Sequence, residues 1–285
     1  MIHLAIVTNE WRDPGLQETR RVLQKIFEYR VKVYFDEKFA NLLTDIKGEI
    51  CFASQKEMFE QAEMLLVLGG DGTILGIAPV AAEYQIPIVG INFGHLGFLA
   101  QAEKGDHSIF DDLFSGKYET TKCMMLNGEI IKNGVQIEKF LALNDIVLSG
   151  SGDLRMIHTA VDVEDTHIGS YFADGIIVAT AVGSTAYSLS AGGAVMHPDV
   201  DAMMITPICP HTLKARSMVI PGKDRIELKA LPPYRTETNV YIDGKKKHIL
   251  ADGELVRITK SKYYTSLIQL EYRNFFDVLR EKLSD

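Results

Sequence analysis

The first half of the chain alternates short apolar runs with segments of helical periodicity. The apolar runs have strand length and cover Ile2–Val7, Val31–Phe35, Met64–Leu68 and Ile86–Ile91. Between them, apolar residues recur at helical spacing after Pro14, over Lys56–Glu63 and over Thr73–Tyr84. Strands that alternate with helices in this way predict an open, Rossmann-like parallel sheet with helices on both faces.

The pattern changes near Tyr118, where short alternating runs separated by turn residues begin. Asp243-Gly244 lies between two such runs, and this dipeptide is a strong signal for a two-residue hairpin. The region therefore predicts a mainly antiparallel β-sandwich, and apolar residues at helical spacing over Asn274–Leu283 predict a closing helix. We expect an α/β domain over 1–117, a β-sandwich over 118–270 and the helix over 271–285.

Composition narrows the class of protein. The chain has 285 residues and 46% hydrophobic residues, enough for a large core, and no apolar run is long enough to span a membrane. The net charge of −8 argues against a nucleic-acid partner. The basic run Lys245–His248 follows the predicted hairpin turn and fits a solvated hairpin. Three scattered cysteines and the absence of a basic N-terminal leader favour the cytoplasm.

The loop Gly69-Gly70-Asp71-Gly72-Thr73 joins an apolar strand to a helix. Its glycines allow the backbone to approach an anion closely, and the helix N-terminus adds a favourable dipole. It lacks the lysine of a Walker A loop and the spacing of a dinucleotide fingerprint. A carboxylate beside phosphates suggests a general base or a ligand of Mg²⁺. A tight turn with Asp71 as the helix N-cap is the alternative.

Two later clusters are candidates for binding. Asn144-Asp145 lies between apolar runs and offers donors and acceptors for ribose hydroxyls, although the pair taken alone is better explained by a turn or Asx motif. After Asp174-Gly175, the segment Gly183–Gly193 is rich in glycine and hydroxyl groups and contains Tyr187, which suits a nucleoside. A glycine-rich turn into a short helix is the alternative there. His197 and His211 are expected to be structural.

Taken together and in order, these motifs resemble the NAD kinase family. The resemblance covers most of the chain, and the motifs that carry it are Gly69–Thr73, Gly90–Phe98, Asn144-Asp145, Ala173–Gly175, Gly183–Tyr187 and Thr206–Thr212. The first motif also occurs in lipid kinases and in relatives of phosphofructokinase, so the later ones give the resemblance its specificity.

The resemblance implies Mg²⁺-dependent phosphoryl transfer from ATP to the 2′-hydroxyl of the adenosine ribose of NAD. It implies that Asp71 is the general base and that Mg²⁺ is held mainly by substrate phosphates. It also implies a C-terminal helix that returns to the first domain and a homodimer or homotetramer. The substrate-binding residues that it implies are Gly72, Leu75, His95, Phe98, Asn144, Asp145, Arg155, Asp174, Thr185, Ala186, Tyr187 and Ser190.

Three positions depart from the family pattern. Many relatives have Asn-Glu in place of Asn144-Asp145, some have a charged residue at the position of Phe172, and many have an amide at Lys245. None of these removes the proposed base. Two other functions stay open: a related kinase of a lipid or sugar hydroxyl, and a dinucleotide sensor without turnover. Inorganic polyphosphate as donor, use of NADH and feedback by NADP are likewise open.

Overall fold

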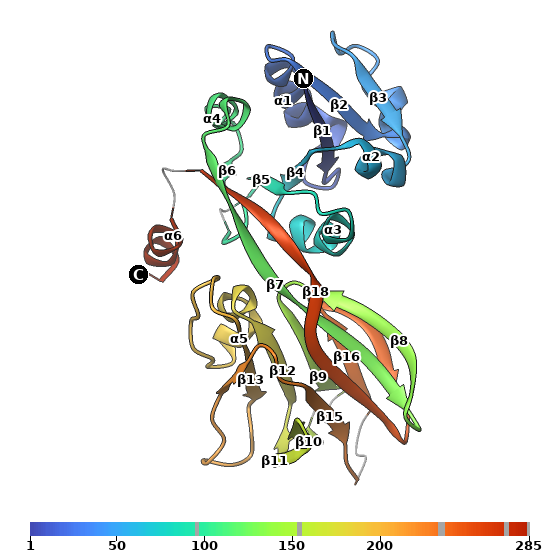
Figure 1. The fold of residues 1–285 in the computed structure, drawn as a ribbon, viewed down its shortest axis with the longest axis vertical. Coiled ribbons are helices and arrows are strands. Elements are labelled where there is room, and N and C mark those ends of the chain that lie inside the picture. Colours follow the sequence, from blue (N-terminus) through green and yellow to red (C-terminus); the bar gives the residue numbers. More distant parts are fainter. Residues whose placement is uncertain (95–96, 153–155, 233–236, 271–273, 284–285) are drawn as a thin grey trace. The chain divides into compact units, whose positions relative to one another are not determined.

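The computed structural model describes residues 1–94, 97–152, 156–232, 237–270 and 274–283. The chain divides into two compact units. The first consists of residues 1–122 and 265–285, and the second of residues 123–264. The second unit is therefore an insertion in the first, and the chain passes between the units in the long strands β7 (Tyr118–Lys132) and β18 (Glu254–Leu270) (Figure 1).

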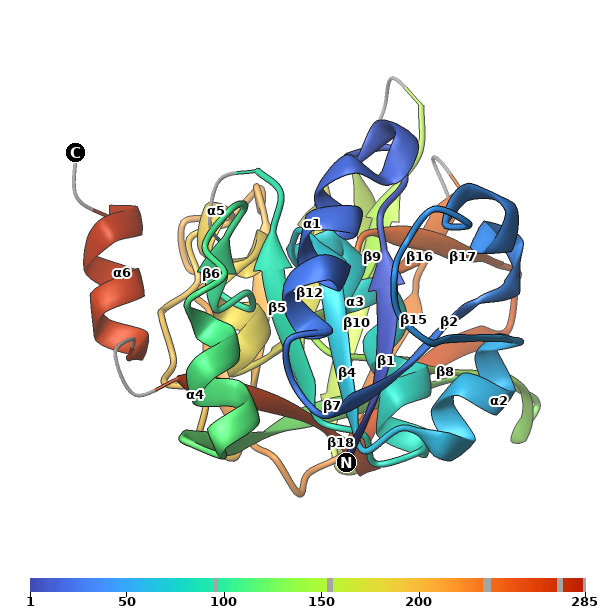
Figure 2. The ribbon, with the colours of Figure 1, turned by 90° about the horizontal axis from the view of Figure 1, so that it is seen from above.

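The first unit is built on a parallel sheet with the strand order β3-β2-β1-β4-β5. Figure 2 shows β5, β4 and β1 side by side in this order. The end of β18 and the short β6 lie beside β5, also in parallel. The strands are β1 (Ile2–Thr8), β2 (Val31–Asp36), β3 (Ile50–Ala53), β4 (Met64–Gly69), β5 (Ile88–Asn92) and β6 (Ala102–Glu103).

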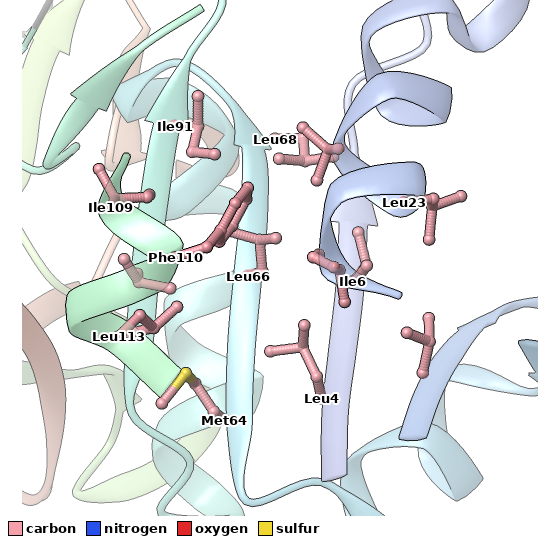
Figure 3. Close-up of a cluster of buried hydrophobic side chains, with 14 of the residues drawn as sticks. Leu4, Ile6, Leu23, Met64, Leu66, Leu68, Ile91, Ile109, Phe110 and Leu113 are labelled. Carbon is pink, nitrogen blue, oxygen red and sulfur yellow. The ribbon is translucent and has the colours of Figure 1, made fainter. Parts of the chain in front are cut away.

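The core of the first unit lies on one face of this sheet. Alternate strand residues such as Leu66 and Leu68 point to this face, where they meet Leu23 of α1 (Gln17–Ile26) and Phe110 of α4 (Ile109–Ser115) (Figure 3). Every residue of β4 is buried, as expected for a central strand that is covered on both faces.

The opposite face is covered by α3 (Asp71–Glu83), which contacts β4 and β5. A Cβ built on Gly90 would lie 2.6 Å from Ile74 Cδ1, so this glycine lets the helix approach β5 closely. The first unit also contains α2 (Gln55–Gln61), which begins with a capping box formed by Ser54 and Glu57, and α6 (Phe275–Leu283).

The start of the first helix differs from the prediction. Pro14 begins only a 3₁₀ turn (Pro14–Leu16), in which Gly15 and Leu16 both have positive φ angles. The α-helix begins at Gln17, where buried Asp13 accepts hydrogen bonds from the N–H groups of Glu18 and Thr19 at 2.9 and 2.8 Å. The apolar spacing located the helix but could not reveal this break.

The second unit has a sandwich core. One layer is antiparallel, with the order β14-β13-β12-β9-β16-β17, and the other contains β11, β10, β15, β18, β7 and β8. Apolar residues of both layers, such as Leu148 and Leu228, share one buried cluster. The strands not yet bounded are β8 (Val135–Ala142), β9 (Asp145–Gly150), β10 (Ile157–Val163), β11 (Thr166–Ala173), β12 (Gly175–Thr180), β13 (Ala202–Ile208), β14 (Met218–Pro221), β15 (Ile226–Ala230), β16 (Thr238–Ile242) and β17 (Lys245–Leu250).

The predicted hairpin is confirmed. Asp243 and Gly244 connect β16 to β17, and both have the positive φ angles that a type I′ turn requires. The predicted fold class, a parallel α/β unit with an antiparallel β unit and a C-terminal helix, is confirmed as well. In the part of the chain that the structure describes, no helix has both the length and the apolar character needed to cross a membrane.

The core of the first unit gives a stability prediction. Leu66 is fully buried in the cluster that also contains Leu23 of α1 and Phe110 of α4. Leu66→Ala should therefore leave a cavity and lower the free energy of unfolding by about 2–5 kcal/mol. Urea unfolding followed by circular dichroism measures the loss. Leu42→Ala is the control, because that side chain is 49% exposed and its truncation should cost clearly less. Equal losses for the two variants would contradict this description of the core.

Candidate functional site

A cavity of about 330 Å³ lies in the first unit, where the sheet reverses its strand order. Strand β1 has β2 on one side and β4 on the other, and ligands of open α/β sheets bind beyond the carboxyl ends of strands at such a point. The residues that follow β1, β4 and β5 meet there. The cavity is lined by Asn9, Arg12, Gly70, Asp71, Gly72, Thr73, Asn92, Gly97 and Lys282.

Asp71 is the first residue of α3, and Gly70 is the N-cap residue, so the alternative that Asp71 caps the helix is wrong. Its carboxylate accepts hydrogen bonds from the N–H of Phe98 at 2.8 Å and the N–H of Leu99 at 3.3 Å. A Cβ on Gly97 would lie 2.0 Å from Asp71 Oδ2, so only glycine fits there. The carboxylate is therefore held in one orientation at the edge of the cavity.

Two cations line the same cavity. Arg12 follows β1, and its guanidinium lies so close to Gly94 that a Cβ there would be 2.7 Å from Nη1. Lys282 comes from α6, at the other end of the sequence. Together with glycine N–H groups and the N-terminus of α3, they favour a ligand that carries several negative charges.

The sequence analysis missed Asn9, Arg12, Asn92 and Lys282. Asn9 donates from Nδ2 to Thr73 Oγ1 at 3.1 Å, which ties the loop after β1 to the glycine-rich loop. Asn92 Oδ1 accepts from the N–H of Gly94 at 2.8 Å. The rule that ligands bind beyond the carboxyl ends of strands could have identified both asparagines, because Asn92 directly follows one predicted strand and Asn9 comes two residues after another. No sequence signal places Lys282 here.

In the second unit, Asn144 directly precedes β9 and Asp145 is its first residue. Their backbone is held by Asp243 of the hairpin turn. The Asp243 carboxylate accepts from the N–H groups of Leu143, Asn144 and Asp145 at 2.9, 2.8 and 3.0 Å. Asn144 Oδ1 is buried and has no hydrogen-bond partner among the residues that the structure describes. Buried polar atoms are normally paired, so this oxygen is suited to a ligand donor.

The carboxyl of Asp145 is 4% exposed and titrates far from its usual range. Burial raises its pKa to about 7, and the negative charge of Asp243 adds to the rise. Burial also raises the pKa of Asp243, while the three backbone N–H groups oppose that rise. The side chain of Asp145 can therefore donate or accept a hydrogen bond near neutral pH.

The segment 180–190 packs directly against Asn144. A Cβ on Gly183 would lie 2.0 Å from the Asn144 carbonyl oxygen, and Thr180 Oγ1 donates to the Leu143 carbonyl at 2.6 Å. The hydroxyls of two serines are used inside the fold: Ser184 bonds to backbone groups and Ser188 to Thr206 Oγ1. Of the four residues here that were predicted to bind substrate, Tyr187 and Ser190 are exposed, whereas Thr185 and Ala186 are half-buried, as is Leu189.

The remaining predicted residues are spread over both units. Leu75 is half-buried in α3, and Phe98 lies 6.5 Å from Phe275 between ring centroids. Asp174 lies in the turn between β11 and β12, where its N–H donates to the Ile208 carbonyl. His95 and Arg155 lie outside the described residues.

Three other positions singled out in the sequence can be placed. Phe172 is largely exposed and stacks on His158 with ring centroids 3.9 Å apart. His197 Nδ1 accepts from the N–H of Asp199 at 3.3 Å. His211 is exposed, and its backbone N–H donates to the Phe172 carbonyl at 2.8 Å.

A cationic cavity with a glycine-rich loop, at the switch point of a parallel sheet, defines a nucleotide-binding α/β protein. Comparison with known families identifies it further. Residues 4–118 match the ATP-NAD kinase N-terminal domain, and residues 143–270 match the ATP-NAD kinase C-terminal domain. The chain belongs to the NAD kinase family, as the resemblance implied.

Known relatives agree along their full length. The chain is 36% identical to an NAD kinase of Thermoanaerobacter sp. (strain X514), covering 100% of both chains. It is 44% identical to an NAD kinase of Symbiobacterium thermophilum, covering 98% of each. The fold is shared with yeast NADH kinase complexed with NADH (TM-score 0.86, 22% identity, 98% of this chain and 86% of that one). It is also similar to an NAD kinase from Archaeoglobus fulgidus in complex with ATP (TM-score 0.73, 25% identity, 97% and 98% coverage).

The buried carboxyl of Asp145 gives a pH prediction. Its pKa in the folded chain, about 7, lies above that of an exposed aspartate, so its contribution to stability is present below about pH 4 and is lost as pH rises through 7. Asp145→Asn should remove this dependence. Urea unfolding at pH 5 and pH 8 should show a steeper loss for the wild type than for the variant. Asp252→Asn, at an exposed turn, should behave as the wild type does; parallel losses for all three chains would contradict the assignment.

Proposed function

We propose that the chain is a kinase that transfers the terminal phosphoryl group of ATP to the 2′-hydroxyl of the adenosine ribose of NAD. The observation that carries the proposal is the Asp71 carboxylate, which is fixed by two backbone N–H groups beside a cationic phosphate cavity. Membership of the family supports both substrates, since relatives are named NAD kinases and one solved neighbour is bound to ATP.

Phosphoryl transfer asks the protein mainly to align the reactants and to neutralise charge. Arg12, Lys282 and the glycine N–H groups of the loop bind the donor phosphates. Asp71 orients the acceptor hydroxyl and accepts its proton as the bond to phosphorus forms. The hydrogen bonds from Phe98 and Leu99 keep the carboxylate from turning away from that hydroxyl.

The residues at the cavity are compatible with Mg²⁺. Asp71, Asn9 and Asn92 provide carboxylate and carboxamide oxygens, the ligands that Mg²⁺ prefers. No group of three His, Cys, Asp or Glu side chains suited to a metal occurs in the described part of the chain. As the family resemblance implies, the ion would be held mainly by the substrate phosphates, which is usual for Mg²⁺, and would neutralise their charge.

The acceptor is bound in this proposal by residues of the second unit. Asn144 Oδ1 accepts from a ribose hydroxyl, and Asp145 pairs with a neighbouring hydroxyl in either protonation state. Thr185, Ala186, Tyr187 and Ser190 would contact the nucleoside. A homodimer or homotetramer remains a prediction from the family resemblance, and a cytoplasmic location remains a prediction from the cysteine usage and the N-terminal sequence.

A matrix of donors and acceptors tests the proposal. The purified chain with Mg²⁺ should form NADP from NAD and ATP. A coupled dehydrogenase assay measures the NADP that is formed. Sphingosine, diacylglycerol and fructose 6-phosphate are the matched acceptors for the related kinases, and NADH and polyphosphate complete the matrix. Turnover of a lipid or sugar alone, or tight binding of NAD without turnover, would overturn the proposal.

Asp71 is tested by its isosteric amide. Asp71→Asn keeps the size of the side chain but cannot accept a proton, so kcat should fall at least about 100-fold, as is typical when a general base is removed. Circular dichroism should show an unchanged fold. Asp252→Asn serves as the matched control and should keep wild-type turnover. Turnover close to normal in Asp71→Asn would refute the role of Asp71 as base.

A further inference from the structure

One highly exposed aromatic residue, Trp11, stands in the sequence between two residues that line the phosphate cavity. Trp11 is 89% exposed and is the single tryptophan of the chain. It lies in the loop that joins β1 to the first helix, between Asn9 and Arg12, which both line the cavity. Single exposed apolar side chains are common on protein surfaces, but an indole flanked by cavity residues offers a flat aromatic face to a ligand, and nothing in the catalytic proposal uses Trp11.

The loop that presents Trp11 is held by hydrogen bonds on both sides. The N–H groups of Trp11 and Arg12 donate to Asn9 Oδ1 at 3.2 and 3.3 Å. Further along, the N–H groups of Arg12 and Asp13 both donate to the Asn9 carbonyl at 3.0 Å. The buried carboxylate of Asp13 in turn accepts hydrogen bonds from N–H groups at the start of the first helix. The backbone that carries the indole is thus already ordered, which lowers the entropic cost of binding a ligand.

We propose that Trp11 is the stacking surface for the base of the donor nucleotide, whose phosphates bind in the cavity beside it. The inference rests on the proposed kinase function and goes further, because it assigns a residue that distinguishes a nucleoside triphosphate from inorganic polyphosphate as the donor. Inorganic polyphosphate carries the same anionic groups but has no base to cover the indole. Stacking of a base on an aromatic side chain is worth about 5- to 150-fold in affinity, enough to separate the two donors.

The geometry favours the donor over the acceptor as the occupant. The guanidinium of Arg12, the next residue, lies near Gly94 and near Gly70 of the glycine-rich loop. In the proposed function the donor phosphates bind at this loop. A base joined through a ribose to those phosphates lies at the rim of the same cavity. Because any base has a flat face, the surface should accept ATP and GTP alike.

Tryptophan fluorescence tests the inference directly, since Trp11 is the only source of the signal. In the absence of NAD, MgATP and MgGTP should quench or shift the emission in a saturable way. Inorganic tripolyphosphate with Mg²⁺ should displace MgATP from the cavity and restore the emission of the free protein. Equal spectral changes with tripolyphosphate, or no change with MgATP at concentrations that saturate turnover, would overturn the inference.

Kinetics give a second readout that does not depend on fluorescence. Trp11→Ala should raise KM for ATP by about 5- to 150-fold, while kcat and KM for NAD stay near wild type, and Trp11→Phe should recover most of the loss. Glu10→Ala changes the exposed neighbour and should leave KM for ATP within twofold. An unchanged KM for ATP in Trp11→Ala, or a raised KM for NAD alone, would refute this role of Trp11. The kinase function is judged separately from the turnover of the unmutated chain with ATP and NAD. Turnover supports that function, and no turnover would refute it, whatever Trp11→Ala shows.

Discussion

The contact between the Asp71 carboxylate and the backbone at 97–99 is the constraint on which the first unit's site depends. Two N–H groups fix the carboxylate, and Gly97 is the residue that makes room for it. A carboxylate at the start of a helix is stabilised by the helix dipole, yet here it is not used as a cap. The fold thus aims a negative group at a cavity whose other charged residues are cations, which is the arrangement that phosphoryl transfer to a hydroxyl requires.

The second unit uses the same physical device for a different purpose. Asp243 binds three successive backbone N–H groups with one half-buried carboxylate and so fixes the path of the chain at Asn144 and Asp145. The left-handed conformation of Asp243 in its hairpin turn brings the carboxylate to that position. Because Asp243 holds the backbone, the side chains of Asn144 and Asp145 are not needed to fix the path of the chain, and Asn144 Oδ1 has no hydrogen-bond partner among the described residues.

The sequence predicted features that depend on local patterns and missed those that depend on topology. The glycine-rich loop, the hairpin and the alternation of strands and helices follow from spacing and turn chemistry within a few residues. Arg12 and Lys282 could not be found in this way, since they meet at the cavity only after the strands have ordered themselves as β2-β1-β4 and α6 has joined the unit. Asp243 was recognised as a turn residue, but its bonds to a segment about a hundred residues earlier leave no local trace.

The insertion of the second unit into the first has a consequence for the order in which the chain is made. Residues 265–285 complete the sheet beside β5 and bring Lys282 to the cavity, but they leave the ribosome only after the whole of residues 123–264. At ordinary rates of synthesis this delay is on the order of ten seconds. During that time a nascent chain has the glycine-rich loop and Arg12 but not Lys282, so the second cation joins the cavity only after the second unit has been made.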